Sequence, residues 1–130
     1  MSELSDKVEK YKADLLAITK LAAEKLHGGL VAKTPIQDGD AQASWTPSIN
    51  RVVAENIYPS RGQNAKTHDV SAVVNPMKLG DDFYVANGQP YIRRLEYTNH
   101  SPQGSHMLAR TKAEWSQIVK AAVRQVKNGS

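Results

Sequence analysis

Four histidines and a few carboxylates are the side chains of this sequence that could bind a metal or transfer protons. The histidines are His27, His68, His100 and His106, and Glu96 precedes His100 by four residues. Imidazole and carboxylate are common zinc ligands, but this spacing matches no established zinc pattern. Two of the histidines also stand in a stretch rich in serine, proline and glycine, which would have to order before it held an ion. We therefore interpret the histidines as exposed loop residues and expect neither a metal nor a cofactor.

The carboxylates that stand apart from the expected helix faces do not form a catalytic pattern either. They are Asp38, Asp40, Asp81, Asp82 and Glu96. The first two flank Gly39 in a turn, where short polar side chains bond to their own backbone. The sequence has no G-x-S-x-G, P-loop or G-x-G-x-x-G motif. We expect no enzymatic activity, although a hydrolase stays open because catalytic triads assemble from distant positions.

Composition limits the remaining classes of protein. The chain of 130 residues is the size of a single domain, residues 1–130. It has no cysteine, which excludes a disulfide framework and thiolate metal sites. The start, "MSELSDKVEKYK", is charged, and no apolar run approaches the roughly 18 residues of a membrane span, so we expect synthesis in the cytoplasm and no membrane partner. A net charge of +4 without a dense basic run leaves a small basic nucleic-acid-binding module as an alternative.

The elements that would position these residues begin with a long helix. Apolar residues recur every three or four positions from Leu4 to Leu26, which predicts one apolar face on a helix. That stripe consists of Leu4, Val8, Tyr11, Leu15, Ile18, Ala22 and Leu26. Ser2 or Ser5 can cap the start of the helix, and Gly28-Gly29 is expected to end it.

The middle of the chain predicts strands and short helices. A strand is expected from Ala43 to Asn50, and a second strand in "DFYVAN". Pro47 either makes the middle of the first strand irregular or places it at a sheet edge. Between them, residues 56–69 lack a period and are expected to form a long loop that orders on assembly. Val70, Val73, Val74 and Met77 follow helical spacing with Pro76 inside the pattern, so only a short helix is expected there. About two helical turns are expected from Pro90, with Arg93 and Arg94 facing water.

A final amphipathic helix closes the chain. Its expected buried stripe is Trp115, Ile118, Val119, Ala122, Val123 and Val126. Thr111 to Glu114 has the spacing of a capping box at the helix start. Both tryptophans, Trp45 and Trp115, lie on apolar faces and are expected in the core, with an anchoring role at an interface as the alternative. The sequence thus predicts an α+β fold, with a long N-terminal helix and a C-terminal helix packed on a small, mostly antiparallel sheet, and with an extended loop.

Two segments resemble motifs of one protein family. "KTPIQDGDAQASW" resembles the T-P-[VI]-D-T-G-x-x-x-x-x-W segment of the small neck or tail-completion proteins of long-tailed bacteriophages. "VANGQPYIRRLEYTNHSPQG" is similar to their N-x-x-P-Y segment, and "MLARTKAEWSQIVKAAV" to their final Arg-Thr and amphipathic helix. The matching residues are Thr34, Pro35, Gly39 and Trp45 in the first segment, and Asn87, Pro90, Tyr91, Leu95 and Glu96 in the second.

The resemblance implies a structural virion protein and not an enzyme. Proteins of this family are head-tail joining or tail-completion subunits that form a ring between the head connector and the tail tube. The implied partners are further copies of the chain, the connector or adaptor, the tail terminator or tube proteins, and DNA in the channel. The implied location is the virion, after synthesis in the host cytoplasm. Our candidate interface residues are Arg61, Lys66, Arg93, Arg94, His100 and His106.

Overall fold

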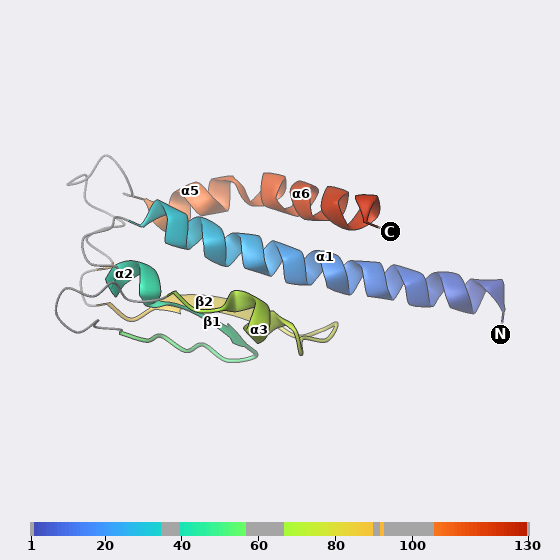
Figure 1. Ribbon diagram of the computed structural model, residues 1–130, viewed down its shortest axis with the longest axis horizontal. Coiled ribbons are helices and arrows are strands. Elements are labelled where there is room, and N and C mark those ends of the chain that lie inside the picture. The colour runs from blue at the N-terminus through green and yellow to red at the C-terminus, as the bar shows by residue number, and fades with distance from the viewer. Residues whose placement is uncertain (1, 35–39, 57–66, 90–91, 93–105, 130) are drawn as a thin grey trace.

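A computed structural model describes residues 2–34, 40–56, 67–89, 92 and 106–129 of the chain. The elements in chain order are α1 (Glu3–Lys33), α2 (Asp40–Ala43), β1 (Trp45–Ile49), α3 (Val70–Val74), β2 (Phe83–Asn87), α5 (Met107–Ala113) and α6 (Trp115–Asn128). Figure 1 shows α1 as the central layer, with α5 and α6 on one side and the sheet with α3 on the other. A long N-terminal helix, a C-terminal helix and a small antiparallel sheet confirm the predicted α+β fold.

The first helix is longer than its apolar pattern predicts. Ser2 caps the start, and its hydroxyl accepts the backbone N–H of Ser5 at 3.2 Å. The prediction that Gly28-Gly29 ends the helix is wrong, since α1 continues to Lys33. Tertiary packing of that last turn outweighs the cost of about 1 kcal/mol for each glycine in a helix. The helix ends where Thr34 adopts an extended conformation directly before Pro35, because proline disfavours helical geometry in the residue before it.

The sheet consists of β1 and β2 only, among the residues that the structure describes. The two strands pair antiparallel, with Trp45 opposite Asn87 and Ile49 opposite Phe83. Pro47 lies in the middle of β1, opposite Val85. Each strand of a two-stranded sheet has a free edge, so a residue without an N–H is tolerated there, as the sequence predicts.

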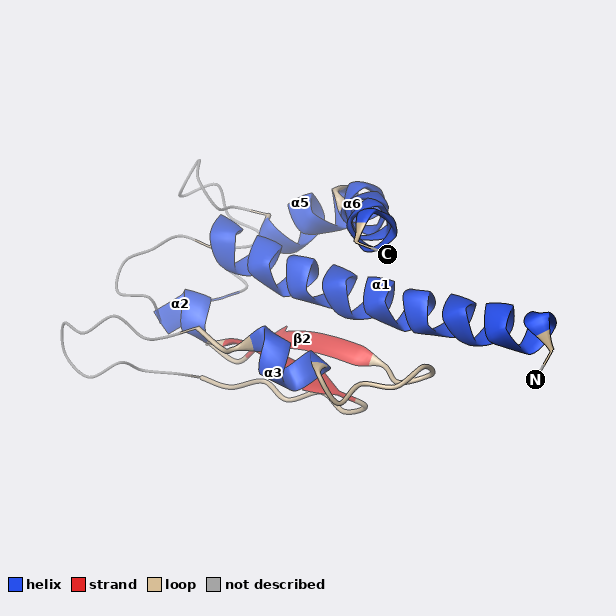
Figure 2. Cartoon of the chain, turned by 45° about the vertical axis from the view of Figure 1, so that its right-hand side comes forward, coloured by secondary structure: helices blue, strands red, loops and turns tan. Residues whose placement is uncertain are grey.

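Two clusters of buried side chains join the layers. Ala23 of α1 packs with Val74 of α3 and with Met77, which follows α3, while Leu30 of α1 packs with Trp45 of β1 and Met107 of α5. Figure 2, turned from the first view, shows α1 running between the sheet and the α5–α6 pair. The core of the described chain is thus built around the C-terminal half of α1.

The C-terminal region differs from its prediction in two respects. It forms two helices that meet at Glu114, and Thr111 lies inside α5, so the expected capping box is wrong. The Glu114 carboxylate instead pairs with Lys33 of α1 at 2.7 Å. The core assignment of Trp115 is also wrong, because this side chain is 43% exposed, whereas Trp45 is 3% exposed and confirms its prediction.

Candidate assembly interface

Residues of the first motif that the structure describes hold the core together. The indole Nε1 of Trp45 donates to the hydroxyl of Thr34 at 2.7 Å. That hydroxyl donates in turn to the backbone carbonyl of Leu30, also at 2.7 Å. Asn87, from the second motif, lies opposite Trp45 in the sheet. These three motif residues therefore link α1, β1 and β2, and their described role is structural.

Replacing Thr34 with valine tests this link. Valine has the same shape, but it leaves the buried indole N–H of Trp45 without an acceptor, so we expect the free energy of unfolding to fall by about 1–3 kcal/mol. Urea unfolding followed by circular dichroism measures the change. Thr34→Ser is the matched control, since it keeps the hydroxyl and should lose less. A larger loss for Thr34→Ser than for Thr34→Val would show that the methyl group, and not the hydrogen bond, matters.

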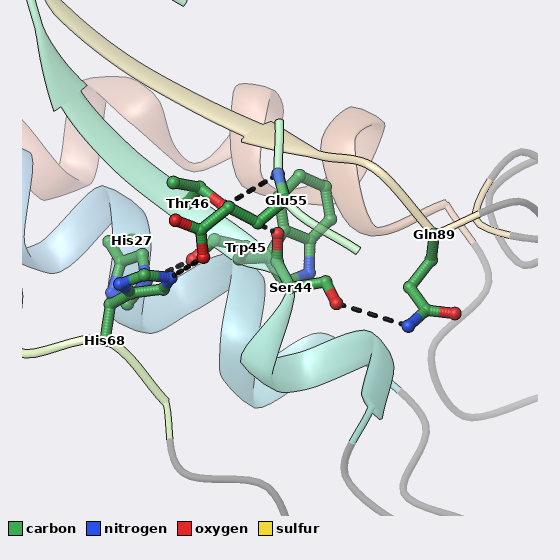
Figure 3. Close-up of polar contacts among 7 residues, drawn as sticks. All are labelled: His27, Ser44, Trp45, Thr46, Glu55, His68 and Gln89. Carbon is green, nitrogen blue, oxygen red and sulfur yellow. Dashed lines mark hydrogen bonds and ion pairs between the residues drawn. The ribbon is translucent and has the colours of Figure 1, made fainter. Parts of the chain in front are cut away.

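One histidine is buried, contrary to the interpretation of all four as exposed loop residues. His27 lies within α1, is 3% exposed, and donates from Nε2 to the carbonyl of Trp45 at 3.0 Å. His68 pairs with a Glu55 carboxylate oxygen, also at 3.0 Å, and Figure 3 shows its ring beside that of His27. Burial lowers the pKa of His27 below its ordinary value of 6.5, the hydrogen bond to Trp45 opposes this shift, and His68 adds to it.

This burial makes the stability of the fold depend on pH. Because the pKa of His27 is lowered in the folded chain, His27 binds a proton more readily in the unfolded chain below about pH 6.5. The free energy of unfolding therefore falls as the pH drops. Glutamine at position 27 keeps an N–H donor but does not titrate. We expect the loss in melting temperature between about pH 7.5 and pH 5.5 to shrink in His27→Gln. His68→Gln is the control for the neighbouring hydrogen bond between His68 and Glu55, and an unchanged pH profile in His27→Gln would contradict the assignment.

The described carboxylates and histidines do not converge on a catalytic centre. Asp81 accepts the backbone N–H of Lys78 at 2.8 Å and the side-chain amide of Asn50 at 3.1 Å, so it stabilises the turn before β2. These two hydrogen bonds lower the pKa of Asp81, the first more than the second. Among the described residues, no group of three metal-ligating side chains comes together.

Most of the predicted interface residues lie outside the described part of the chain. These are Arg61, Lys66, Arg93, Arg94 and His100. His106 is described, and it is exposed at the start of α5 with a left-handed backbone, φ 63°. The helix expected from Pro90 likewise lies outside the described residues, apart from Ile92, which packs against the cluster of Leu30, Trp45 and Met107.

The surface that sequence reasoning missed is the N-terminal half of α1, residues 3–15, which we call the arm. In Figure 1 the arm runs on past the C-terminal end of α6 and beyond the sheet. Four residues of the predicted apolar stripe lie here, and all are exposed: Leu4 by 71%, Val8 by 41%, Tyr11 by 68% and Leu15 by 41%. The arm thus carries apolar side chains that the described part of the chain leaves exposed, Leu4 and Tyr11 more than Val8 and Leu15.

A second apolar surface lies at the opposite end of α1, and we call it the groove. It has a volume of about 790 Å³ and is formed where α1, β2 and the start of the C-terminal helices meet. Its lining residues are Leu26, Leu30, Val85, Leu108, Ala109, Thr111, Lys112 and Trp115. Trp115 and Leu108 are its large exposed apolar side chains. The groove explains why Trp115 is not in the core, since the indole covers one side of an open depression.

Comparison with known proteins adds no family or fold assignment. No protein-family model matches the chain. No curated protein and no solved structure matches it either. Within the described ranges, none of the helices combines the length and apolar character that a bilayer span requires.

Proposed function

We propose that this chain is a structural subunit of the neck of a long-tailed phage, where a homo-oligomeric ring joins the head connector to the tail tube. The resemblance of residues 33–45 and 85–104 indicates this class. The observation that carries the proposal is the arm, on which Leu4, Val8, Tyr11 and Leu15 expose apolar area on a projecting helix. Apolar surface of this kind typically marks a protein interface, and a ring subunit would cover it with its neighbours.

The partners of such a subunit follow from the same proposal. They are further copies of the chain, the connector or adaptor on the head side, and the terminator or tube proteins on the tail side. Arg61 and Lys66 would face DNA in the channel, while Arg93, Arg94, His100 and His106 would face a neighbouring protein. In this function the chain works by binding alone and turns over no substrate.

Joining of phage particles in vitro tests the proposal. Heads and tails are prepared from a phage that lacks this subunit, the purified chain is added, and joined particles are counted by electron microscopy. We expect the chain to restore joining and to occupy the neck as a ring. A Trp45→Ala chain, whose core is disrupted, is the matched control. Particles that join equally well without the folded chain would contradict the proposal.

A nucleic-acid-binding module is the alternative, and the composition of α6 favours it. This helix carries Lys120, Arg124 and Lys127 and has no acidic residue from Trp115 to Asn128. Binding through phosphate contacts falls steeply with salt, by a slope of about 0.9 in log affinity for each contact. Nanomolar to micromolar affinity of the free chain for DNA, with such a slope and without joining activity, would favour the alternative.

A further inference from the structure

We propose that the arm of one copy docks in the groove of a second copy, with the acidic first turn of the arm beside the basic edge of α5. This inference rests on the proposed function, because it names the partner that covers the exposed apolar surface of the ring subunit. The arm and the groove occur on the same chain, so every copy brings one of each.

The arm cannot fill the groove of its own chain. Both belong to α1, which runs unbroken from Glu3 to Lys33. A helix rises about 1.5 Å per residue, so the 22 steps from Leu4 to Leu26 place these residues about 33 Å apart. Contact between an arm and a groove is therefore a contact between two molecules.

The spacing of apolar residues on the arm is that of a helix that binds in an apolar groove. Leu4, Val8, Tyr11 and Leu15 stand at positions i, i+4, i+7 and i+11 of a helix, which is the spacing of anchors in peptides that bind as a helix in an apolar groove. Leu26, in the wall of the groove, continues the same stripe of α1. A docked arm would thus cover the Leu26 end of the stripe in the second copy. In its own chain, the arm forms the Leu4 end of the same stripe.

The charges of the two surfaces are complementary. Within the arm, Lys10 pairs with Asp14 at 3.0 Å and Lys12 with Glu9 at 3.8 Å. The start of the arm keeps two acidic residues, Glu3 and Asp6, followed by one base, Lys7. None of the three forms an ion pair with any described residue, so this end carries a net negative charge.

The edge of the groove has the opposite sign. Arg110 and Lys112 lie in the last turn of α5 and form no ion pair within the described ranges. The nearby carboxylate of Glu114 already pairs with Lys33. Within the described ranges, the net negative start of the arm and the two bases of α5 have no partner of opposite charge, which favours this end of the arm for that edge of the groove.

Exchange of these charges tests the docking. The first variant carries Glu3→Lys and Asp6→Lys, and the second carries Arg110→Glu and Lys112→Glu. Analytical ultracentrifugation of the purified full chain measures association. Concentrations up to about 100 µM are needed, because an arm about 20 Å long makes an interface smaller than the standard size. We expect each variant alone to associate at least about tenfold more weakly than the parent, and a mixture of the two to associate again.

The chain offers a matched control for this experiment. Lys120→Glu with Arg124→Glu makes the same change of charge on α6, away from the groove lining. We expect this control to associate as the parent does. All four altered residues of the two test variants are exposed, so circular dichroism and melting temperature should stay close to those of the parent.

A second measurement uses the absence of cysteine from the sequence. Chains with Leu4→Cys are mixed with chains that carry Leu108→Cys and are then oxidised. Docking in the proposed orientation predicts a disulfide-linked heterodimer, which the charge-reversed arm should abolish. The control pair replaces Leu108→Cys with Ser116→Cys, an exposed position outside the groove lining.

The outcomes separate this inference from the proposed function. A parent chain that stays monomeric up to about 100 µM, or association that neither charge exchange weakens, would overturn the docking. Arm variants that still join heads to tails would overturn it too and would leave the neck function standing. Association restored on mixing, in a chain that does not join particles, would support the docking and remove the neck function.

Discussion

Replacement of Trp45 by alanine should lower the free energy of unfolding by about 3–5 kcal/mol. The indole is 3% exposed, packs against Leu30 and Met107, and donates to Thr34. Its removal opens a cavity between α1, β1 and α5 and also leaves the hydroxyl of Thr34 without its donor. Because domains are stable by only about 5–15 kcal/mol, much of the stability would disappear. Urea unfolding monitored by circular dichroism measures this loss.

The other tryptophan provides the control. Trp115 is 43% exposed at the groove, so Trp115→Ala should cost only about 1–2 kcal/mol. If Trp45→Ala does not fold well enough to measure, Trp45→Phe keeps most of the apolar area and should still lose about 1 kcal/mol with the hydrogen bond. Equal losses for the two alanine variants, under conditions where the chain is monomeric, would contradict the positions of both indoles.

Alanine at position 88 should also destabilise the fold, by about 1–3 kcal/mol or more. The added Cβ would lie 2.8 Å from the carbonyl oxygens of both Ala54 and Glu55, which are backbone atoms without freedom to turn away. Moving them would strain the hydrogen bond from the N–H of Gly88 to the Glu55 carbonyl, which is 2.9 Å long. The midpoint of urea unfolding reports the effect.

Gly28 is the matched control for the same substitution. It lies within α1, and a Cβ there would meet no atom within 4 Å. Alanine favours a helix over glycine by about 1 kcal/mol, so Gly28→Ala should raise stability. Destabilisation by Gly28→Ala would contradict the continuous helix, and a neutral Gly88→Ala would contradict the close approach of residues 54–55 to the end of β2.

The sequence pattern predicted the elements better than their ends. The stripe from Leu4 to Leu26 gave the helix, but its true end depends on Pro35, which constrains Thr34, and not on the two glycines. The glycines carry a propensity cost that packing around Leu30 outweighs, and that packing is a property of the tertiary structure. The start of α5 has no comparable local signal, because His106 before it adopts a left-handed backbone and makes no side-chain cap.

The candidate site was harder to predict, because periodicity reports which residues share a face but not what covers it. Apolar residues recur at the same spacing in the buried and the exposed halves of the stripe of α1. Helix lengths did contain a signal: 14 residues of α6 reach about 21 Å, whereas 31 residues of α1 reach about 46 Å. α6 by itself is therefore shorter than the stripe, which spans about 33 Å from Leu4 to Leu26. The exposure of Trp115 has the same cause: its position on the apolar face of α6 was predictable, but periodicity does not show whether another element packs against that position.

The unbroken course of α1 across its covered and uncovered halves gives the helix a gradient of local stability. A free peptide the length of the arm would hardly form a helix in water, because the first turn is costly to nucleate. Here the buried turns around Ala22 and Leu30 serve as the nucleus, so each residue of the arm adds to an existing helix. Amide hydrogens near Leu4 should exchange with solvent through fraying, whereas those near Leu30 should exchange only when the domain opens. Any partner that binds the arm would therefore slow exchange at a helix end that the fold itself leaves free to unwind.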